Sequence, residues 1–201
     1  MTDSALNSNP LASGVTTDLR LVVLDIDGTI SGESNEVNPG VIHALQTVKE
    51  QGIQVAIATG RMYRSALYFA QAIGADLPII CYNGAWIQDA KTEETLWHLP
   101  VPRELALELL DYCEHPERRA DLDVHFYLND ELYVREITED TRLYIERSRI
   151  EANAVGDLRN ILEEPPTKVL AMSSQPEVTK TLLSTLQQDR KSTRLNSSHY
   201  S

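Results

Sequence analysis

The first part of the chain alternates short apolar runs with longer stretches whose apolar residues recur at helical spacing. Residues 21–25 are β-branched and apolar on both faces, a pattern typical of a buried parallel strand. Asn38 and Pro39 resemble the N-cap and first residue of a helix, and Gly52 and Gly74 follow the ends of two helical repeats. The pattern predicts strands at residues 21–25, 53–58 and 77–82, and helices at residues 39–51 and 62–73.

This order of elements is βαβαβ. Right-handed crossovers place such strands side by side in one sheet, with their carboxyl ends along a shared edge. We expect helices on both faces of this sheet. Because ligands of open α/β sheets bind outside the carboxyl ends of the strands, functional side chains are expected along that edge.

The pattern changes near residue 85, where β-type runs and helices stop alternating regularly. A hairpin is expected around the turn Asn129-Asp130, since β-type runs flank it on both sides. The change predicts an α+β unit. Its expected elements are hairpins within residues 86–97 and 124–134, a strand at residues 168–172, and helices at residues 102–113 and 177–188.

Both ends of the chain differ in composition from the regions between them. The first residues are rich in Ser, Asn, Thr and Gly, and the last eleven fall abruptly into Ser/Asn-rich sequence that looks foreign to the fold. The expected division is a flexible leader at residues 1–18, half of an α/β core at residues 19–84, an α+β domain at residues 85–190 and a non-native-looking tail at residues 191–201.

The acidic balance of the chain narrows the classes of partner. With 18 Lys and Arg against 30 Asp and Glu, the formal net charge is −12, which argues against nucleic acid and against an anionic membrane surface. No apolar run approaches the roughly 20 residues of a transmembrane helix. Cys81 and Cys113 form no CxxC pair, so we expect neither a disulfide framework nor a zinc–thiolate site, and a reducing cytoplasm fits best.

Two carboxylates follow the first predicted strand directly. Asp25 and Asp27 would lie at the carboxyl end of that strand, held by rigid backbone and facing the open edge. One such group can attack phosphorus while the other moves protons. Because Mg²⁺ prefers hard oxygen ligands, Asp25 and Asp27 are also the predicted metal ligands. Gly28 allows a sharp turn, and Gly28 and Thr29 are predicted to border a bound phosphate.

A second polar cluster follows the second predicted strand. Thr59-Gly60-Arg61 would bring a hydroxyl, a backbone N–H and a guanidinium to the same edge, and all three are donors for phosphate. Thr59 is expected to bond a phosphoryl oxygen, and Arg61 to contact either substrate or a nearby acid. The alternative is a helix N-cap followed by a solvated arginine, but the nearby carboxylates favour the functional interpretation. Asn83-Gly84 ends the third strand, and it either lines the same site or forms the turn that leaves the core.

Three motifs together resemble a known family. Asp25-Ile-Asp-Gly-Thr29, Thr59-Gly-Arg61 and Tyr82-Asn-Gly-Ala85, in this order, resemble the haloacid dehalogenase-like superfamily and specifically its Cof-type phosphatases. The resemblance implies an α/β fold, with a Rossmann-like parallel-sheet core and an inserted α+β cap domain of class IIB. It also implies a Mg²⁺-dependent phosphatase acting on small phosphorylated metabolites, such as sugar phosphates or nucleotides.

The resemblance assigns roles residue by residue. Asp25 would be the nucleophile and a metal ligand, and Asp27 the general acid/base that also lends its carbonyl to Mg²⁺. Gly28 and Thr59 would help to hold the phosphate. Family members carry two further motifs after the cap, a lysine and a Gly-Asp…Asn-Asp segment, and neither is found here. Lys180 and Lys191 are candidates for the lysine by position only.

Two other functions stay open, the first because it shares the same motif and cap plan and the second because the downstream motifs are missing. One is a phosphotransferase of the phosphomannomutase type, which passes the phosphoryl group to a sugar instead of water. The other is a truncated module that binds Mg²⁺ and phosphate without turnover. Release of phosphate without an added acceptor separates the first from a hydrolase. The sequence predicts neither the natural substrate nor the oligomeric state.

Overall fold

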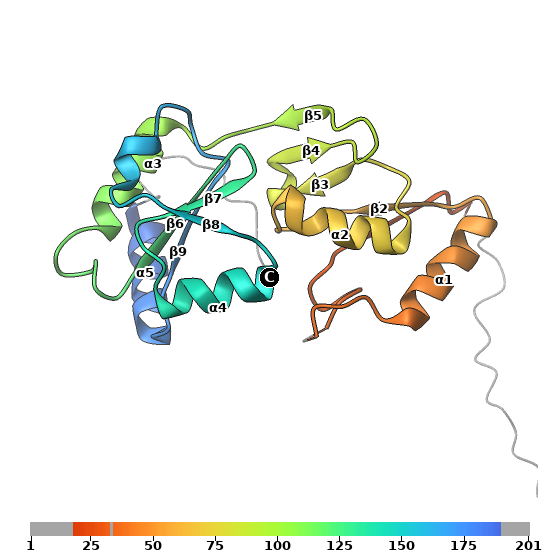
Figure 1. Cartoon of the computed structure of the whole chain (residues 1–201), viewed down its shortest axis with the longest axis horizontal. Coiled ribbons are helices and arrows are strands. Elements are labelled where there is room, and N and C mark those ends of the chain that lie inside the picture. The colour runs from red at the N-terminus through yellow and green to blue at the C-terminus, as the bar shows by residue number, and fades with distance from the viewer. Residues whose placement is uncertain (1–17, 33, 190–201) are drawn as a thin grey trace, which may run out of the picture.

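The computed structural model describes residues 18–32 and 34–189, so the predicted leader up to residue 17 and the predicted tail lie outside the described residues. Figure 1 shows two groups of elements, a core from the first half of the chain and a cap from the second. None of the helices in these two ranges is long and apolar enough to span a membrane. In chain order the elements are β1 (Leu21–Leu24), α1 (Pro39–Glu50), β2 (Gln54–Ile57), α2 (Tyr63–Ile73), β3 (Ile79–Cys81), the 3-10 turn η1 (Tyr82–Gly84), β4 (Trp86–Gln88), β5 (Thr95–His98), α3 (Arg103–Cys113), β6 (Asp123–Leu128), β7 (Glu131–Val134), α4 (Glu139–Ser148), β8 (Ala152–Ala154), η2 (Leu158–Ile161), β9 (Lys168–Met172) and α5 (Pro176–Asp189).

The core begins as the sequence predicts. β1 and β2 pair in parallel, and α1 connects them. The side chain of Asn38 accepts a hydrogen bond from Gly40 N–H at 2.8 Å, and Pro39 occupies the first turn, where a missing N–H costs nothing. α2 ends at Gly74, whose φ of 61° is the left-handed conformation of a helix C-cap. These start and stop signals are confirmed.

β3 connects the parallel pair to an antiparallel hairpin. On one side it meets the end of β2 through a parallel bridge between Ala58 and Ile80, and on the other it pairs with β4, which pairs with β5. The hairpin β4–β5, which we placed in the α+β domain from the sequence, therefore hydrogen-bonds to a strand of the core. The sheet of the cap starts only at β6.

One face of β1 is left uncovered by the residues that the structure describes. α1 and α2 contact each other, because two right-handed crossovers that advance in the same direction put both helices on one face of the sheet. Leu24 packs against the core on that face, whereas Leu21 and Val23 point the other way and are 42% and 49% exposed. The sequence predicted that β1 is buried on both faces and that helices cover both faces of the sheet. For the described part of the chain both predictions are wrong.

The cap is a four-stranded sheet of order β8-β7-β6-β9, packed against α3 and α5 through a second apolar cluster that includes Leu110, Phe126 and Leu158. The sequence did not predict α4 and β8. In α4 only Thr141 is buried, so the helix has little apolar periodicity to detect. β8 has 3 residues and is mostly exposed.

His125 of β6 is buried without full hydrogen bonding. Its ring is 0% exposed, Nε2 lies 3.0 Å from Thr141 Oγ1, and Nδ1 has no partner within the described ranges. Tyr144 packs edge-on against the ring at 5.1 Å between centroids. Burial, with a smaller contribution from the charge of Lys168, lowers the pKa of His125 from 6.5 to about 4. The imidazole is therefore neutral in the folded chain near neutral pH.

The buried His125 makes the stability of the chain depend on pH. Unfolded chains take up the proton near pH 6.5, while the folded chain takes it up only near pH 4, so the stability contributed by the neutral ring is complete above pH 6.5 and is lost as the pH falls towards 4. Between pH 6.5 and pH 4 the free energy of unfolding should fall by roughly 3 kcal/mol because of His125, and we expect His125→Phe to abolish this fall. Urea unfolding followed by circular dichroism across this range measures it.

The matched control for His125 is the exposed His115, whose side chain is 49% exposed. In His115→Phe the loss of stability towards pH 4 that we assign to His125 should persist, because His125 is still present. An equal slope for His125→Phe and the unmodified chain would contradict the assignment of this effect to His125.

Candidate active site

The first candidate motif forms a tight turn directly after β1. The carbonyl of Ile26 accepts hydrogen bonds from the N–H groups of Thr29, Ile30 and Ser31, at 3.2, 3.2 and 3.0 Å. Ile26 and Ile30 are 0% and 3% exposed, so they anchor the turn in the core. Gly28 has φ of 75°, which a residue with a Cβ adopts only with strain.

Alternation along this turn exposes the two carboxylates. Asp25 and Asp27 flank the buried Ile26 and both are exposed, as are Gly28 and Thr29. Asp25 Oδ1 accepts a hydrogen bond from Ile26 N–H at 2.7 Å, which fixes the orientation of that carboxylate. The structure therefore presents both side chains to solvent at the carboxyl end of β1, as predicted.

Arg61 reaches across from the end of β2 and binds both oxygens of Asp27. Its Nη2 lies 2.6 Å from Oδ1, and its Nε lies 3.0 Å from Oδ2. This two-pronged geometry is the strongest arrangement that an arginine and a carboxylate form. These hydrogen bonds hold the pKa of Asp27 below its usual value, against a smaller opposing effect of burial. Because the Asp27 side chain is 56% exposed, solvent screens much of the energy of the pair.

The guanidinium of Arg61 is held from several sides, and its side chain is only 13% exposed. Nη2 donates to Asn35 Oδ1 at 2.7 Å and Nη1 donates to Ser65 Oγ at 3.3 Å. The ring of Phe69 lies 4.6 Å below the guanidinium carbon, a cation–π distance. The solvated arginine that the sequence left as an alternative is therefore not what the structure contains.

The second and third motifs pack against each other. Thr59 is buried, and its Oγ1 accepts the Arg61 N–H at 3.2 Å. The N–H of Asn83 donates to Thr59 O at 2.9 Å, and the Asn83 amide covers Gly60 so closely that a Cβ on Gly60 would lie 2.9 Å from its Oδ1. Asn83 and Gly84 have φ of 57° and 92°. Asn83-Gly84 therefore forms the turn that leaves the core after β3, and the same turn borders the Thr59-Gly60-Arg61 segment. The two interpretations given by the sequence are compatible.

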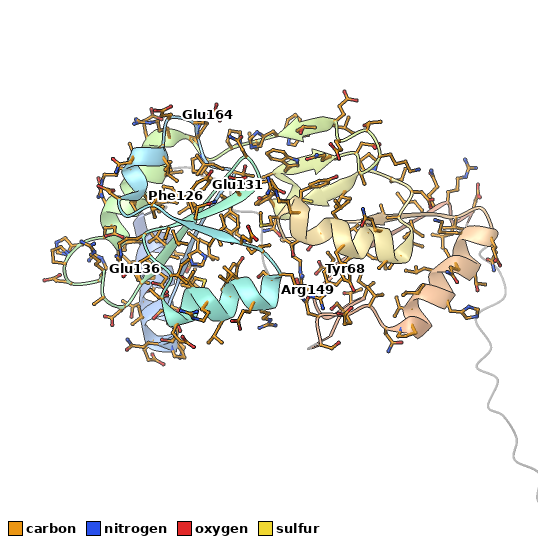
Figure 2. All side chains as sticks on the ribbon, in the orientation of Figure 1. Tyr68, Phe126, Glu131, Glu136, Arg149 and Glu164 are labelled. Carbon is orange, nitrogen blue, oxygen red and sulfur yellow. The ribbon has the colours of Figure 1, made fainter. Side chains whose placement is uncertain are left out.

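The cap contributes neighbours that the sequence did not reveal. Asn35 Nδ2 donates to the carbonyl of Arg147 at 2.7 Å, and Ser65 Oγ donates to the carbonyl of Ser148 at 2.8 Å. Both carbonyls belong to the last turn of α4. Figure 2 shows Arg149, just past that helix, beside Tyr68 of α2, over whose ring its guanidinium lies at 4.9 Å. No signal in the sequence marks these contacts, because they are made by backbone carbonyls of an element that lacks apolar periodicity.

The donors for a metal ion are few. Within residues 18–32 and 34–189 no cluster of three or more His, Cys, Asp or Glu side chains suited to a metal occurs. Asp25 and Asp27 supply exposed carboxylate and carbonyl oxygens, which are the ligands that Mg²⁺ prefers, and Mg²⁺ sites often use only one or two carboxylates with water and substrate phosphate. The donor set therefore fits Mg²⁺, with Arg61 as a competitor for Asp27.

The chain is similar to curated proteins of one family. It is 29% identical over 164 residues to the 5-amino-6-(5-phospho-D-ribitylamino)uracil phosphatase of Bacillus subtilis, in an alignment that covers 79% of this chain and 57% of that protein. It is 36% identical over 92 residues to the pyridoxal phosphate phosphatase of Escherichia coli, which covers 46% of this chain and 34% of that protein. The chain thus spans little more than half the length of the first relative.

The fold is similar to that of a solved haloacid dehalogenase-like hydrolase from Bacteroides thetaiotaomicron, with a TM-score of 0.70 and 22% identity over 84% of this chain and 63% of that one. The sequence profile of the haloacid dehalogenase-like hydrolases matches residues 22–201, which is most of the chain. The resemblance inferred from the three motifs is confirmed. This chain belongs to the haloacid dehalogenase-like hydrolase family.

Proposed function

We propose that the protein is a Mg²⁺-dependent phosphomonoester hydrolase that acts on small phosphorylated metabolites through a phosphorylated Asp25. The observation that carries this proposal is the placement of two exposed carboxylates, Asp25 and Asp27, at the carboxyl end of β1, with Arg61 reaching them from the end of β2. Family membership supports the same reaction class.

The proposed reaction has two displacements at phosphorus. A carboxylate oxygen of Asp25 forms a bond to phosphorus while the bond to the leaving oxygen breaks. Asp27, after release from Arg61 and uptake of a proton, gives that proton to the leaving oxygen. Water then attacks the phosphoryl group on Asp25, Asp27 takes the proton from the water, and the bond between phosphorus and Asp25 breaks. The products are the alcohol and inorganic phosphate, with both aspartates restored.

Donors around Asp25 would hold the phosphoryl oxygens. Thr59 and the backbone N–H of Gly60 lie along the same edge of the sheet, where they would bind those oxygens. The N–H groups of Gly28 and Thr29 donate within their own turn, to Ser31 O at 2.9 Å and to Ile26 O at 3.2 Å. A bound phosphoryl group would also offer Arg61 an acceptor other than Asp27, leaving Asp27 free for proton transfer. Mg²⁺ would be held by the Asp25 carboxylate and the Asp27 carbonyl, and it supplies positive charge that offsets the phosphoryl oxygens.

A cavity of about 300 Å³ lies at the junction of core and cap. Its wall includes Arg64, Asp130 and Arg149 but none of Asp25, Asp27, Thr59 and Arg61, so we do not assign it to the leaving group. The two relatives named above act on phosphorylated small molecules of different structure, which supports the class of substrate but not one compound. The buried free thiols of Cys81 and Cys113 support a reducing cytoplasm as its location.

The proposed nucleophile is tested by hydrolysis of p-nitrophenyl phosphate with and without Mg²⁺. We expect Asp25→Asn to lower the turnover by on the order of 10³-fold or more, because the amide cannot attack phosphorus. Asp18→Asn, at an exposed residue before the other end of β1, is the matched control and should keep full activity. Circular dichroism verifies that the three proteins are equally folded.

Four outcomes of that assay would count against the proposal. Equal turnover in Asp25→Asn, or turnover independent of Mg²⁺, would exclude the proposed mechanism. Release of p-nitrophenol only in the presence of a sugar acceptor, with the phosphoryl group transferred to that sugar, would favour the phosphotransferase. A well-folded chain without turnover would favour the module that binds Mg²⁺ and phosphate.

Arg61 should be irreplaceable by lysine. The ammonium of lysine is a point charge and cannot bind two carboxylate or phosphoryl oxygens in parallel, so we expect Arg61→Lys to lower kcat/KM about 10²-fold. Arg142→Lys, at an exposed arginine of α4 paired only with Glu139 among the described residues, is the matched control. A loss of less than about threefold in Arg61→Lys would show that the two-pronged geometry is not needed for turnover.

A further inference from the structure

The turn between β6 and β7 of the cap inserts a carboxylate into the core. Asn129 and Asp130 form this turn with φ of 50° and 58°, the left-handed conformations that a two-residue hairpin turn requires. Asn129 is exposed, but Asp130 is only 6% exposed. A nearly buried carboxylate at the tip of a hairpin is costly unless donors surround it.

Two of its donors belong to the first turn of α2. Asp130 Oδ1 accepts the N–H of Tyr63 and Oδ2 accepts the N–H of Arg64, both at 2.8 Å. The N-cap residue of this helix, Met62, makes no capping hydrogen bond through its side chain within the described part of the chain. The carboxylate that satisfies the free N–H groups at the start of α2 therefore comes from the cap, and it lies at the positive end of the helix dipole.

The third donor belongs to a different segment of the core. Tyr82 OH donates to Asp130 Oδ1 at 2.8 Å, and the Tyr82 ring packs edge-on against Tyr127 of β6 at 5.8 Å between centroids. The backbone of Tyr82 is tied to the second motif, because its N–H donates to Arg61 O at 2.9 Å. One carboxylate of the cap thus holds both core segments that border the proposed phosphate site.

We propose that Asp130 is a positioning residue. While the cap is docked, it holds the Thr59-Gly60-Arg61 segment and the Tyr82-Asn83-Gly84 turn in fixed positions relative to each other. Its carboxylate oxygens are occupied by Tyr63, Arg64 and Tyr82, so it acts through these residues and not on substrate. The inference rests on the proposed phosphatase function for its effect on turnover, but its effect on the backbone is independent of that function.

Burial raises the pKa of Asp130, and the hydrogen bonds from Tyr82, Arg64 and Tyr63 oppose that rise. The guanidinium of Arg64, with Nε at 3.7 Å, lies near the same carboxylate. The site is therefore built from donors that compensate a desolvated acid, which is the arrangement expected of a residue that holds a fixed geometry.

Amide hydrogen exchange distinguishes a positioning residue from a simple helix cap. In Asp130→Asn, the side-chain NH₂ must face one of the donors, so the amides of Tyr63 and Arg64 should exchange about tenfold faster or more. If Asp130 also positions the second segment, the amides of Tyr82 and Asn83, which do not touch its side chain, should accelerate as well. Acceleration at Tyr63 and Arg64 alone would reduce Asp130 to a helix cap and overturn the proposal.

Two further variants separate the contacts. Tyr82→Phe removes one hydroxyl and leaves the cap of α2 intact, so only the amides of Tyr82 and Asn83 should accelerate. Asn129→Gly alters the same turn at a left-handed position that glycine tolerates, and it should change neither pair of amides. Changes in Asn129→Gly equal to those in Asp130→Asn would assign the effect to the turn as a whole and would contradict the role of Asp130.

Turnover of p-nitrophenyl phosphate gives the second readout, at a temperature where circular dichroism shows every variant folded. We expect Asp130→Asn and Tyr82→Phe to lower kcat about tenfold with KM changed less than about threefold, because geometry at phosphorus is lost without a substrate contact. Full kcat in an Asp130→Asn protein with accelerated Tyr82 and Asn83 amides would overturn the functional part of the inference. No turnover in the unmodified chain would contradict the proposed function, and amide exchange would then decide the role of Asp130.

Discussion

The parallel pairing of β1 with β2 is the constraint on which the candidate site depends. It brings Asp27 and Arg61 together although 34 residues separate them, because both strands end at the same edge of the sheet. The last residues of the strands, Leu24 and Ile57, are direct partners, and the hydrogen bond from Ala58 N–H to Leu24 O at 2.9 Å continues the pairing to the point where the chemistry-bearing residues begin. Arg61 can therefore reach Asp27 without any distortion of the strands.

Much of this arrangement could be predicted from the sequence, because its determinants are local. The apolar run ending at Asp25, the cap at Asn38 and the glycine at position 74 each carry a signal within a few residues, and the order βαβαβ then determines which ends meet. A contact of Arg61 with substrate or a nearby acid was expected from the sequence. Its binding to both oxygens of Asp27 was not, since that geometry depends on a side-chain direction and on Asn35 and Ser65, which no motif marks.

The parts that could not be predicted depend on contacts between distant segments. The run at residues 21–25 looks buried on both faces, but burial is a property of what packs on a strand, and in the described part of the chain only one face is covered. α4 was missed because only Thr141 of this helix is buried, so its sequence shows little apolar periodicity. Its last carbonyls meet Asn35 and Ser65, and these contacts need backbone in a given place more than any particular side chain.

The contacts between cap and core differ in the free energy that they contribute to docking the cap. The ion pair of Arg149 with Glu36 is made between side chains that are 40% and 51% exposed, so solvent screening and side-chain entropy cancel most of its energy. The Asp130 side chain is 8% exposed and accepts three hydrogen bonds, and leaving buried donors of this kind unpaired costs about 1–3 kcal/mol each. Movement of the cap would therefore break the Asp130 contacts at a much higher cost than the surface pairs. Since those contacts hold the start of α2 and the turn after β3, the docking of the cap and the geometry of the candidate phosphate site should change together.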